Sequence, residues 1–238
     1  MKFWLVIPAA GIGSRMASDR PKQYLQVAGK TILEHTLDIF LPHPQLQGAA
    51  VAVAEHDSYW PDLPLVQHPL VRQVVGGQER ADSVLNALRV LPNLGAQPCD
   101  WVLVHDAARP MLQRTDLDRL LSTLKYDAVG GLLAYPARDT LKLADAQQRS
   151  QQTLQREHIW HALTPQMFPL QLLSDALEQA LAAGVAITDE ASAVEWAGFK
   201  PRLVVGRSDN LKITYPEDLQ LLAAVHEPTG LVDGVIDV

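Results

Sequence analysis

Residues 3–16 read FWLVIPAAGIGSRM, an apolar run that leads directly into a glycine-rich loop. The run 3–7 predicts the first buried strand of a parallel sheet, because such strands are covered on both faces and are apolar throughout. Glycines in the following loop let the backbone approach a ligand, and successive N–H groups can converge on phosphate oxygens. Arg15 and Lys22 add cations beside those amides, which indicates a polyphosphate rather than a single anion.

Three interpretations of this loop compete. An isolated Gly-x-Gly usually marks only a tight strand-to-helix turn, here with surface cations. A dinucleotide-binding fingerprint requires glycine three residues after Gly13, where this chain has Met16, and no Walker-type Gly-Lys-Ser/Thr is present. The third interpretation rests on Gly-x-Gly-x-Arg-Met followed by Pro-Lys at 21–22, which resembles the signature of sugar-nucleotide pyrophosphorylases and related nucleotidyltransferases.

Composition limits the class of protein. The chain has 238 residues, enough for one large α/β domain with a substantial core. Its net charge of −7 argues against a general affinity for nucleic acid or anionic membranes, so the important cations should gather at a local site. The single cysteine, Cys99, excludes an intrachain disulfide and a thiolate metal cluster, and we expect it to be buried as a small hydrophobe.

The cellular compartment follows from the same features. A lone cysteine fits a reducing cytoplasm. Lys2 and the apolar residues after it could suggest a short secretory signal, but cleavage would remove the phosphate-loop pattern, so we do not expect one. No apolar run is long enough to span a membrane, and the expected location is the cytoplasm.

Strand-like and helical runs alternate through the first 135 residues. This order predicts an α/β fold, a doubly wound and mainly parallel sheet with helices on both faces. Expected strands are 3–7, 49–54, 71–75, 101–104 and 202–205; expected helices are 31–41, 79–91, 115–124 (capped), 170–181 (ended by Gly184), 191–196 and 216–225.

A polar segment interrupts this pattern at 137–160, where 140–143 and 152–154 alternate weakly like an exposed hairpin. An exposed hairpin is marginally stable alone, so we expect it to lean on a partner subunit. The predicted organisation is therefore one domain formed by 1–136 and 161–226, a β-arm for dimerisation at 137–160, and a frayed tail at 227–238.

A second chemical signal is the run VLVHDAARP at 102–110, a buried strand that ends in Asp106. Open α/β sheets bind ligands at the carboxyl ends of their strands. A carboxylate there, beside a triphosphate, most simply holds Mg²⁺. The alternative is a helix cap or an ion pair with Arg109.

Three other loops carry weaker signals. The run GGQERADS at 76–83 is a glycine turn that enters a helix, and TDEAS at 188–192 is a helix N-cap followed by first-turn acids. The run GRSDNLKIT at 206–214 follows the last strand and by itself resembles a solvated loop. None of the three would identify a site alone.

Together these segments resemble the 2-C-methyl-D-erythritol 4-phosphate cytidylyltransferase family from residue 6 to about residue 222. The resemblance implies a Rossmann-like nucleotidyltransferase fold with a protruding β-arm that is exchanged in a homodimer. It also implies the transfer of a cytidylyl group from CTP to 2-C-methyl-D-erythritol 4-phosphate, which yields 4-diphosphocytidyl-2-C-methyl-D-erythritol and pyrophosphate for isoprenoid biosynthesis. Gln78 departs from the family, many of whose members have an acidic residue there. The motifs that carry the resemblance are PAAGIGSRM, PKQYL, GGQERADSV, LVHDAARP, RDT, WHALTPQ, ITDEAS and DNLKIT.

The resemblance further implies roles for individual residues. The catalytic residues would be Arg15 and Lys22, which stabilise the transition state, and Arg156 and Lys212, which position the acceptor phosphate. Asp106 would hold Mg²⁺. Contacts to CTP would come from Ala9, Ala10, Gly11, Gly13, Gly77, Ser83, Asp106 and Ala107, and contacts to the polyol from Arg109, Thr140, Thr164 and Thr188.

Two rival functions remain open at this point. The first is a ribitol-5-phosphate cytidylyltransferase, which has the same fold and chemistry with another polyol. The second is a nucleotide-binding protein without catalysis, which a full set of phosphate-binding cations argues against. In the favoured reaction the nucleophile is a phosphate oxygen, already anionic at neutral pH, so no general base is required. We expect small-molecule substrates and a homodimer, and neither nucleic acid nor a membrane as partner.

Overall fold

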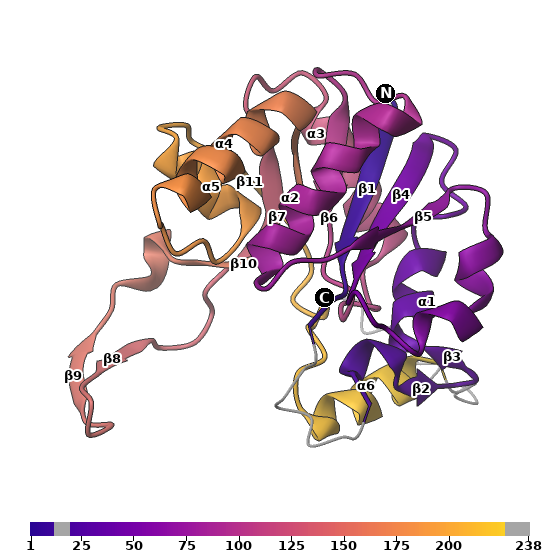
Figure 1. Cartoon of the computed structure of the whole chain (residues 1–238). Helices are drawn as coiled ribbons and strands as arrows, with labels where there is room; N and C mark the ends of the chain where they lie inside the picture. The colour runs from indigo at the N-terminus through magenta and orange to yellow at the C-terminus, as the bar shows by residue number, and fades with distance from the viewer. Residues whose placement is uncertain (12–19, 227–238) are drawn as a thin grey trace.

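The computed structural model describes residues 1–11 and 20–226, and its centre is a seven-stranded sheet with the order β11-β7-β10-β6-β1-β4-β5 (Figure 1). Four of its strand pairs are parallel, and only β10 runs antiparallel to its neighbours β6 and β7. The expected mainly parallel sheet is therefore confirmed. Its strands are β1 (Phe3–Pro8), β4 (Leu46–Val53), β5 (Val71–Val75), β6 (Trp101–Val104), β7 (Gly131–Pro136), β10 (Trp160–Pro169) and β11 (Arg202–Val205).

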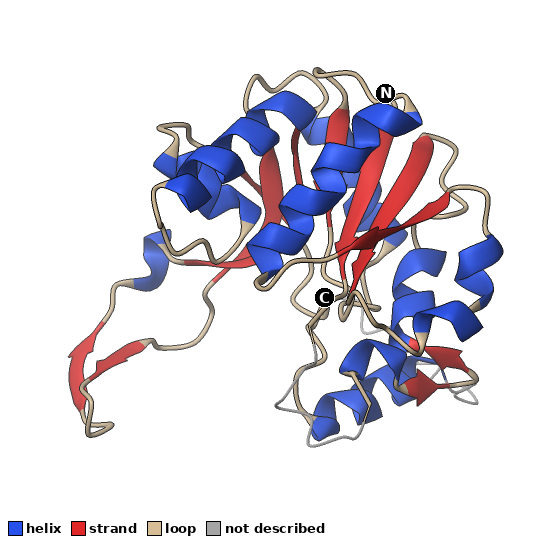
Figure 2. Cartoon of the chain, viewed as in Figure 1, coloured by secondary structure: helices blue, strands red, loops and turns tan. Residues whose placement is uncertain are grey.

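Helices cover both faces of the sheet (Figure 2). The residues of β1 alternate between two hydrophobic cores: Leu5 lies in one and Val6 in the other, both fully buried. Each core is closed by its own helices, so the doubly wound arrangement expected from the apolar strands is confirmed. The first core packs against α1 (Ile32–Asp38) and α3 (Arg114–Leu124), and the second against α2 (Arg80–Val90), α4 (Leu170–Ala182) and α5 (Glu190–Trp196).

A third, smaller cluster lies beside the sheet. There α6 (Pro216–His226) packs near the two-stranded sheet of β2 (Gln26–Val27) and β3 (Lys30–Thr31). Within residues 1–11 and 20–226, no helix is both long and apolar enough to cross a membrane. The short 3-10 helices are η2 (Lys22–Tyr24), η3 (Trp60–Asp62), η4 (Pro64–Gln67), η5 (Leu91–Leu94) and η6 (Arg156–His158).

The polar segment forms the expected arm. Its strands β8 (Lys142–Ala144) and β9 (Ser150–Thr153) pair antiparallel in a sheet of their own, and every residue in them is exposed. Figure 1 shows the arm projecting away from the body at the ends of β7 and β10. A protruding β-arm is therefore confirmed. The tail at 227–238, expected to be frayed, lies outside the described residues.

Several expectations need correction. The strands β7 and β10 have no counterpart among those expected. For β10 the reason is that it contains Pro165 and Pro169, and proline argues against a central strand. The register of β10 against β7 shifts between Ala162 and Gln166, which accommodates Pro165. The helix α3 has no side-chain cap: Gln113 precedes it without a capping hydrogen bond. The expected burial of Cys99 is also wrong, because it lies exposed in the turn before β6.

Candidate active site

A cavity of about 230 Å³ lies at the carboxyl ends of the parallel strands, where β1, β5 and β6 give way to loops. We call it the first cavity. Open α/β sheets place ligands at this edge, because the loops after the strands converge there. The residues expected at a nucleotide site that line it are Ala9, Ala10, Gly11, Lys22, Gly77, Ser83, Asp106, Ala107 and Lys212. Gly13 and Arg15, also expected there, lie outside the described residues.

The loop after β5 is held tightly against the first turn of α2. The backbone N–H of Gly77 donates to Oγ of Ser83 at 3.0 Å, and that hydroxyl donates to the carbonyl of Glu79 at 3.2 Å. A Cβ atom on Gly77 would lie 2.2 Å from Cβ of Asp82, so only glycine permits this approach. Gln78 lines the first cavity between these anchored residues.

The segment at η2 is tied to the loop after β1 by a residue that the sequence did not single out. Gln23 is buried, and its Nε2 donates to the carbonyls of Ala9 at 2.6 Å and Gly11 at 3.0 Å. Its neighbour Lys22 donates from Nζ to the carbonyl of Ile213 at 2.9 Å. These contacts fix a cation on the wall of the first cavity, as expected for Lys22.

Asp106, immediately beyond β6, is surrounded by cations. Its Oδ1 lies 3.0 Å from Nε of Arg80, and its Oδ2 lies 3.0 Å from Nζ of Lys212 and 3.3 Å from Nε of Arg109. Burial alone would raise the pKa of this carboxyl, but the three cations hold that pKa well below its usual range. The carboxyl of Asp106 is therefore ionised at neutral pH, and the ion pair with Arg109, considered as an alternative role, is present.

A second cavity, of about 210 Å³, adjoins the first. Both cavities are lined by Arg80, Asp106 and Lys212, which form the wall between them. This second cavity contains the residues expected around a polyol: Arg109, Thr164 and Thr188.

Thr164 is engaged with the protein itself. Its buried hydroxyl accepts from the backbone N–H of Asp106 at 3.1 Å and lies 2.9 Å from Nδ1 of His105. Burial lowers the pKa of His105 to about 4, so its ring is neutral at neutral pH. One tautomer satisfies every contact: Nε2–H donates to the carbonyl of Arg109 at 3.0 Å, and Nδ1 accepts from Thr164. The chain of hydrogen bonds holds Asp106 and Arg109 in place.

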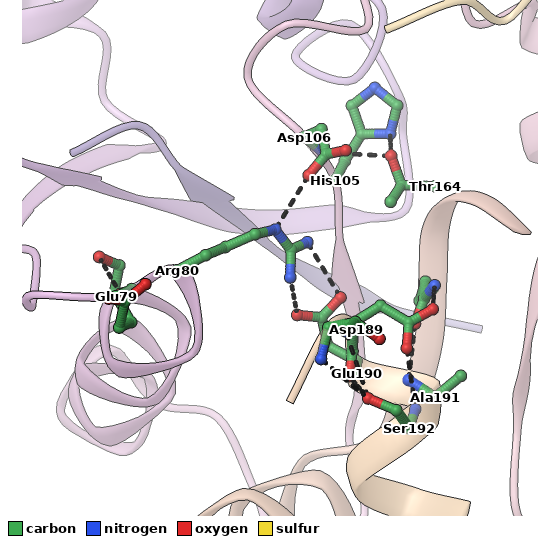
Figure 3. Close-up of polar contacts among 12 residues, drawn as sticks. Glu79, Arg80, His105, Asp106, Thr164, Asp189, Glu190, Ala191 and Ser192 are labelled. Atoms are coloured by element: carbon green, nitrogen blue, oxygen red, sulfur yellow. Dashed lines mark hydrogen bonds and ion pairs between the residues drawn. The ribbon is translucent and has the colours of Figure 1, made fainter. Parts of the chain in front are cut away.

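The charged residue that sequence reasoning missed is Arg80. Its guanidinium donates to Oε1 of Glu190 at 2.6 Å and to Oε2 at 3.1 Å, besides its contact with Asp106 (Figure 3). Glu190 is the first residue of α5, and the expected N-cap before it is confirmed, since Asp189 accepts from the N–H of Ser192 at 2.9 Å. Residues 110 positions apart meet here, a relation that no local motif signals.

Two expected site residues lie elsewhere. Thr140 and Arg156 are exposed residues of the arm segment and line neither cavity. Arg156 donates from Nη1 to the carbonyl of Arg138, within the same segment. Within one chain, therefore, they are not brought together with Lys22 and Lys212.

Comparison with known proteins gives a consistent result. The family model described as IspD, 2-C-methyl-D-erythritol 4-phosphate cytidylyltransferase, matches residues 3–227. The protein of that name from Ectopseudomonas mendocina is 65% identical over 221 residues, 93% of this chain and 94% of the relative. A crystal structure of 4-diphosphocytidyl-2C-methyl-D-erythritol synthase superposes with a TM-score of 0.82 at 38% identity, covering 94% of this chain and 98% of the other. The Francisella tularensis cytidylyltransferase gives a TM-score of 0.80 at 36% identity, covering 93% and 98% of the two chains.

Proposed function

The chain belongs to the 2-C-methyl-D-erythritol 4-phosphate cytidylyltransferase family, and from that premise we propose how its two cavities divide the reaction. It is a CTP-dependent nucleotidyltransferase that transfers a cytidylyl group from CTP to 2-C-methyl-D-erythritol 4-phosphate in isoprenoid precursor biosynthesis. The first cavity takes CTP, and the second takes the polyol phosphate. The observation that carries this assignment is the shared wall, which would place the acceptor phosphate next to the α-phosphate of CTP.

The proposed chemistry is attack of an acceptor phosphate oxygen on the α-phosphorus of CTP, with pyrophosphate leaving. The nucleophile is already anionic, so the protein must reduce the repulsion between two anions and stabilise the charge that builds up. Lys22 is proposed to neutralise the α-phosphate and the leaving pyrophosphate, together with Arg15, which lies outside the described residues. Lys212, on the shared wall, is proposed to position the acceptor phosphate.

The loops supply the remaining substrate contacts in this proposal. Small residues in the loops after β1, β5 and β6 let the backbone approach the nucleotide: Ala9, Ala10, Gly11, Gly77 and Ala107. Ser83, in the first turn of α2, and Gly13, outside the described residues, are proposed as further contacts to CTP. Arg109 and Thr188 are proposed to contact the polyol from the second cavity. Thr164 lines the same cavity, but because its hydroxyl is already bonded to Asp106 and His105, we propose that it acts mainly by holding Asp106.

Mg²⁺ is proposed as the cofactor, held by Asp106. Among the described residues no group of three or more His, Cys, Asp or Glu side chains could form a metal site by itself. Mg²⁺ in nucleotide enzymes commonly takes one or two carboxylates and completes its shell with phosphate oxygens, so one ionised carboxylate on the cavity wall fits. The ion would compete with Arg80, Arg109 and Lys212 for the oxygens of Asp106. When bound, it would neutralise part of the triphosphate charge.

A homodimer is proposed to complete the site. The chain divides in this proposal into a catalytic body, 1–136 and 161–226, and the arm at 137–160. An isolated two-stranded hairpin is marginally stable, and every residue of β8 and β9 is exposed, which favours contact with a second copy. The arm would then deliver Thr140 and Arg156 to the acceptor cavity of the partner. The single cysteine supports the cytoplasm as its location.

The test is pyrophosphate release from CTP and Mg²⁺, with 2-C-methyl-D-erythritol 4-phosphate and ribitol 5-phosphate compared as acceptors. We expect release with the first acceptor only. Release only with ribitol 5-phosphate would mean that the second cavity binds ribitol 5-phosphate, and that the protein is the rival cytidylyltransferase. Silence with both acceptors, in a protein that still binds CTP, would contradict the catalytic assignment.

A further inference from the structure

The guanidinium of Arg80 lies between two buried carboxylates, those of Asp106 and Glu190 (Figure 3). Its Nε donates to Asp106, and its two terminal nitrogens donate to the two oxygens of Glu190 in a bidentate fork. Glu190 is only 1% exposed, while the Arg80 side chain remains 28% exposed and lines both cavities. A fork of this kind fixes orientation as well as charge.

The pair joins the two loops that would bind the two substrates. Arg80 begins α2, directly after the loop 76–79, of which residues 77–79 line the first cavity. Glu190 begins α5, directly after Thr188 and Asp189, which line the second cavity. One ion pair therefore sets the position of the nucleotide loop relative to the acceptor loop.

Glu190 could have the simpler role of an acid that stabilises the start of a helix. Other groups, however, already accept from the first N–H groups of α5. The backbone N–H of Ala191 donates to Oε1 of Gln166 at 2.7 Å, and the N–H of Ser192 donates to Oδ1 of Asp189 at 2.9 Å. Gln166 also donates from Nε2 to Oδ2 of Asp189 at 2.8 Å. These bonds order the first turn of α5, and the carboxylate of Glu190 turns to Arg80 instead.

We propose that Glu190 is a positioning residue: it holds the Arg80 guanidinium on the shared wall, facing the point where the two substrates meet. Each terminal nitrogen of Arg80 uses one N–H on Glu190 and keeps a second for a substrate oxygen. Glu190 also restrains Arg80 from turning fully onto either substrate. This inference rests on the assignment of the two cavities to CTP and the acceptor.

The first test is Glu190→Gln, measured by steady-state kinetics with CTP and 2-C-methyl-D-erythritol 4-phosphate. The amide cannot accept both N–H groups, so Arg80 loses its fixed orientation while the site gains net positive charge. We expect kcat to fall by about 10²-fold, the scale of a misplaced catalytic contact. We also expect the KM for CTP to stay constant or to fall. A kcat within threefold of the parent, or a raised KM at constant kcat, overturns the proposal.

A second variant covers the case in which Glu190→Gln does not fold. Glu190→Asp keeps the charge but withdraws the carboxylate by one methylene group, and we expect the same fall in kcat without a rise in KM. An unchanged kcat in this variant overturns the proposal. The double-mutant cycle with Arg80→Lys adds a further check, because residues that act through one contact give losses that do not multiply. If the fold losses in kcat of the two single variants multiply in the double variant, the proposal is overturned.

The matched control lies on the same helix. Arg89 of α2 pairs with Glu178 of α4 at 3.0 Å, with both side chains about half exposed and outside the cavities. Glu178→Gln breaks an exposed Arg–Glu pair between the same two residue types, in which Arg89 contacts only Oε1, and we expect unchanged kinetics. Lys22→Ala distinguishes a failure of the positioning role of Glu190 from a failure of the cavity assignment. If kcat falls for Lys22→Ala but not for Glu190→Gln, only the positioning role of Glu190 is wrong. If kcat stays near the parent value for both variants, the assignment of the two cavities is wrong as well.

Discussion

Nζ of Lys212 lies 3.0 Å from Oδ2 of Asp106, so a cation from the loop after β11 meets the carboxylate beyond β6 on the wall between the two cavities. The same oxygen lies 3.3 Å from Nε of Arg109. One carboxylate thus holds cations that a substrate phosphate could also attract. The carboxylate of Asp106 therefore pairs with the same cations that we propose for the substrate phosphates.

The first expectation concerns Asp106→Asn. Without the carboxylate charge, Arg80, Arg109 and Lys212 can pair with substrate anions instead. CTP without Mg²⁺ should therefore bind to the variant at least as tightly as to the parent protein. Turnover with Mg²⁺ should nevertheless fall by about 10²-fold or more, because preorganised charges at a reacting phosphate contribute on that scale. Calorimetric titration of CTP in metal-free buffer, beside steady-state kinetics, measures both. Weaker metal-free binding would contradict this account of Asp106.

The second expectation concerns Lys22→Ala. Loss of one donor to the transition state should lower kcat by roughly 10²–10³-fold while the thermal unfolding midpoint stays close to the parent value. Lys200→Ala is the matched control, because Lys200 is exposed and lines neither cavity. A near-normal kcat for Lys22→Ala would remove Lys22 from the mechanism.

The third expectation concerns Ser83→Ala. The variant leaves the N–H of Gly77 without its acceptor at 3.0 Å and loosens the loop after β5. A hydrogen bond of this kind contributes about 1 kcal/mol, so the KM for CTP should rise about 5-fold. The KM for the acceptor should not change, because Ser83 lines only the first cavity. An equal rise in both KM values would mean that the two cavities are assigned wrongly.

The fourth expectation tests the arm. Arg156→Ala and Lys22→Ala should each be nearly inactive as purified proteins. If arm residues serve the partner's site, a mixed dimer contains one site that lacks both residues and one site with neither substitution. Mixing the two variants should therefore restore up to about half of the activity per dimer formed. No recovery, with subunit exchange demonstrated by differently tagged chains, would exclude a shared site.

The fifth expectation is a pH dependence of stability. Burial lowers the pKa of His105 from 6.5 to about 4, so the unfolded chain takes up this proton first as the pH falls. The contribution of His105 to folding is complete above pH 6.5 and is lost as the pH falls toward 4. Between pH 7.5 and 5.0 the free energy of unfolding should fall by about 2 kcal/mol from this group.

Urea unfolding in metal-free buffer measures that slope, and His105→Gln provides its control. Glutamine can still accept from Thr164 and donate to the carbonyl of Arg109, but it does not titrate. The variant should show a shallower dependence on pH over the same range. Equal slopes for the two proteins would show that His105 does not titrate as described.

The sequence was sufficient for the loops that form the first cavity, and it failed where long-range contacts decide the structure. The apolar runs and glycines at 3–11, 71–77 and 101–107 predict strands that end in loops, and this depends mainly on neighbouring residues in the chain. The strand β10 could not be recognised, since two prolines are tolerated there only because its neighbours and a register shift accommodate them. The pairing of Arg80 with Glu190 depends on how α2 and α5 approach, which no spacing in the chain encodes.

The point at which the arm leaves the body has a consequence for engineering. Pro136 and Trp160 stand opposite each other in the antiparallel pair of β7 and β10, so the arm begins and ends about one strand spacing apart, roughly 5 Å. A segment with ends this close can be excised and closed by a short turn without pulling on the sheet. The arm can thus be exchanged between relatives without altering the nucleotide loops; if it contacts a second copy as proposed, the exchange would change which subunits associate.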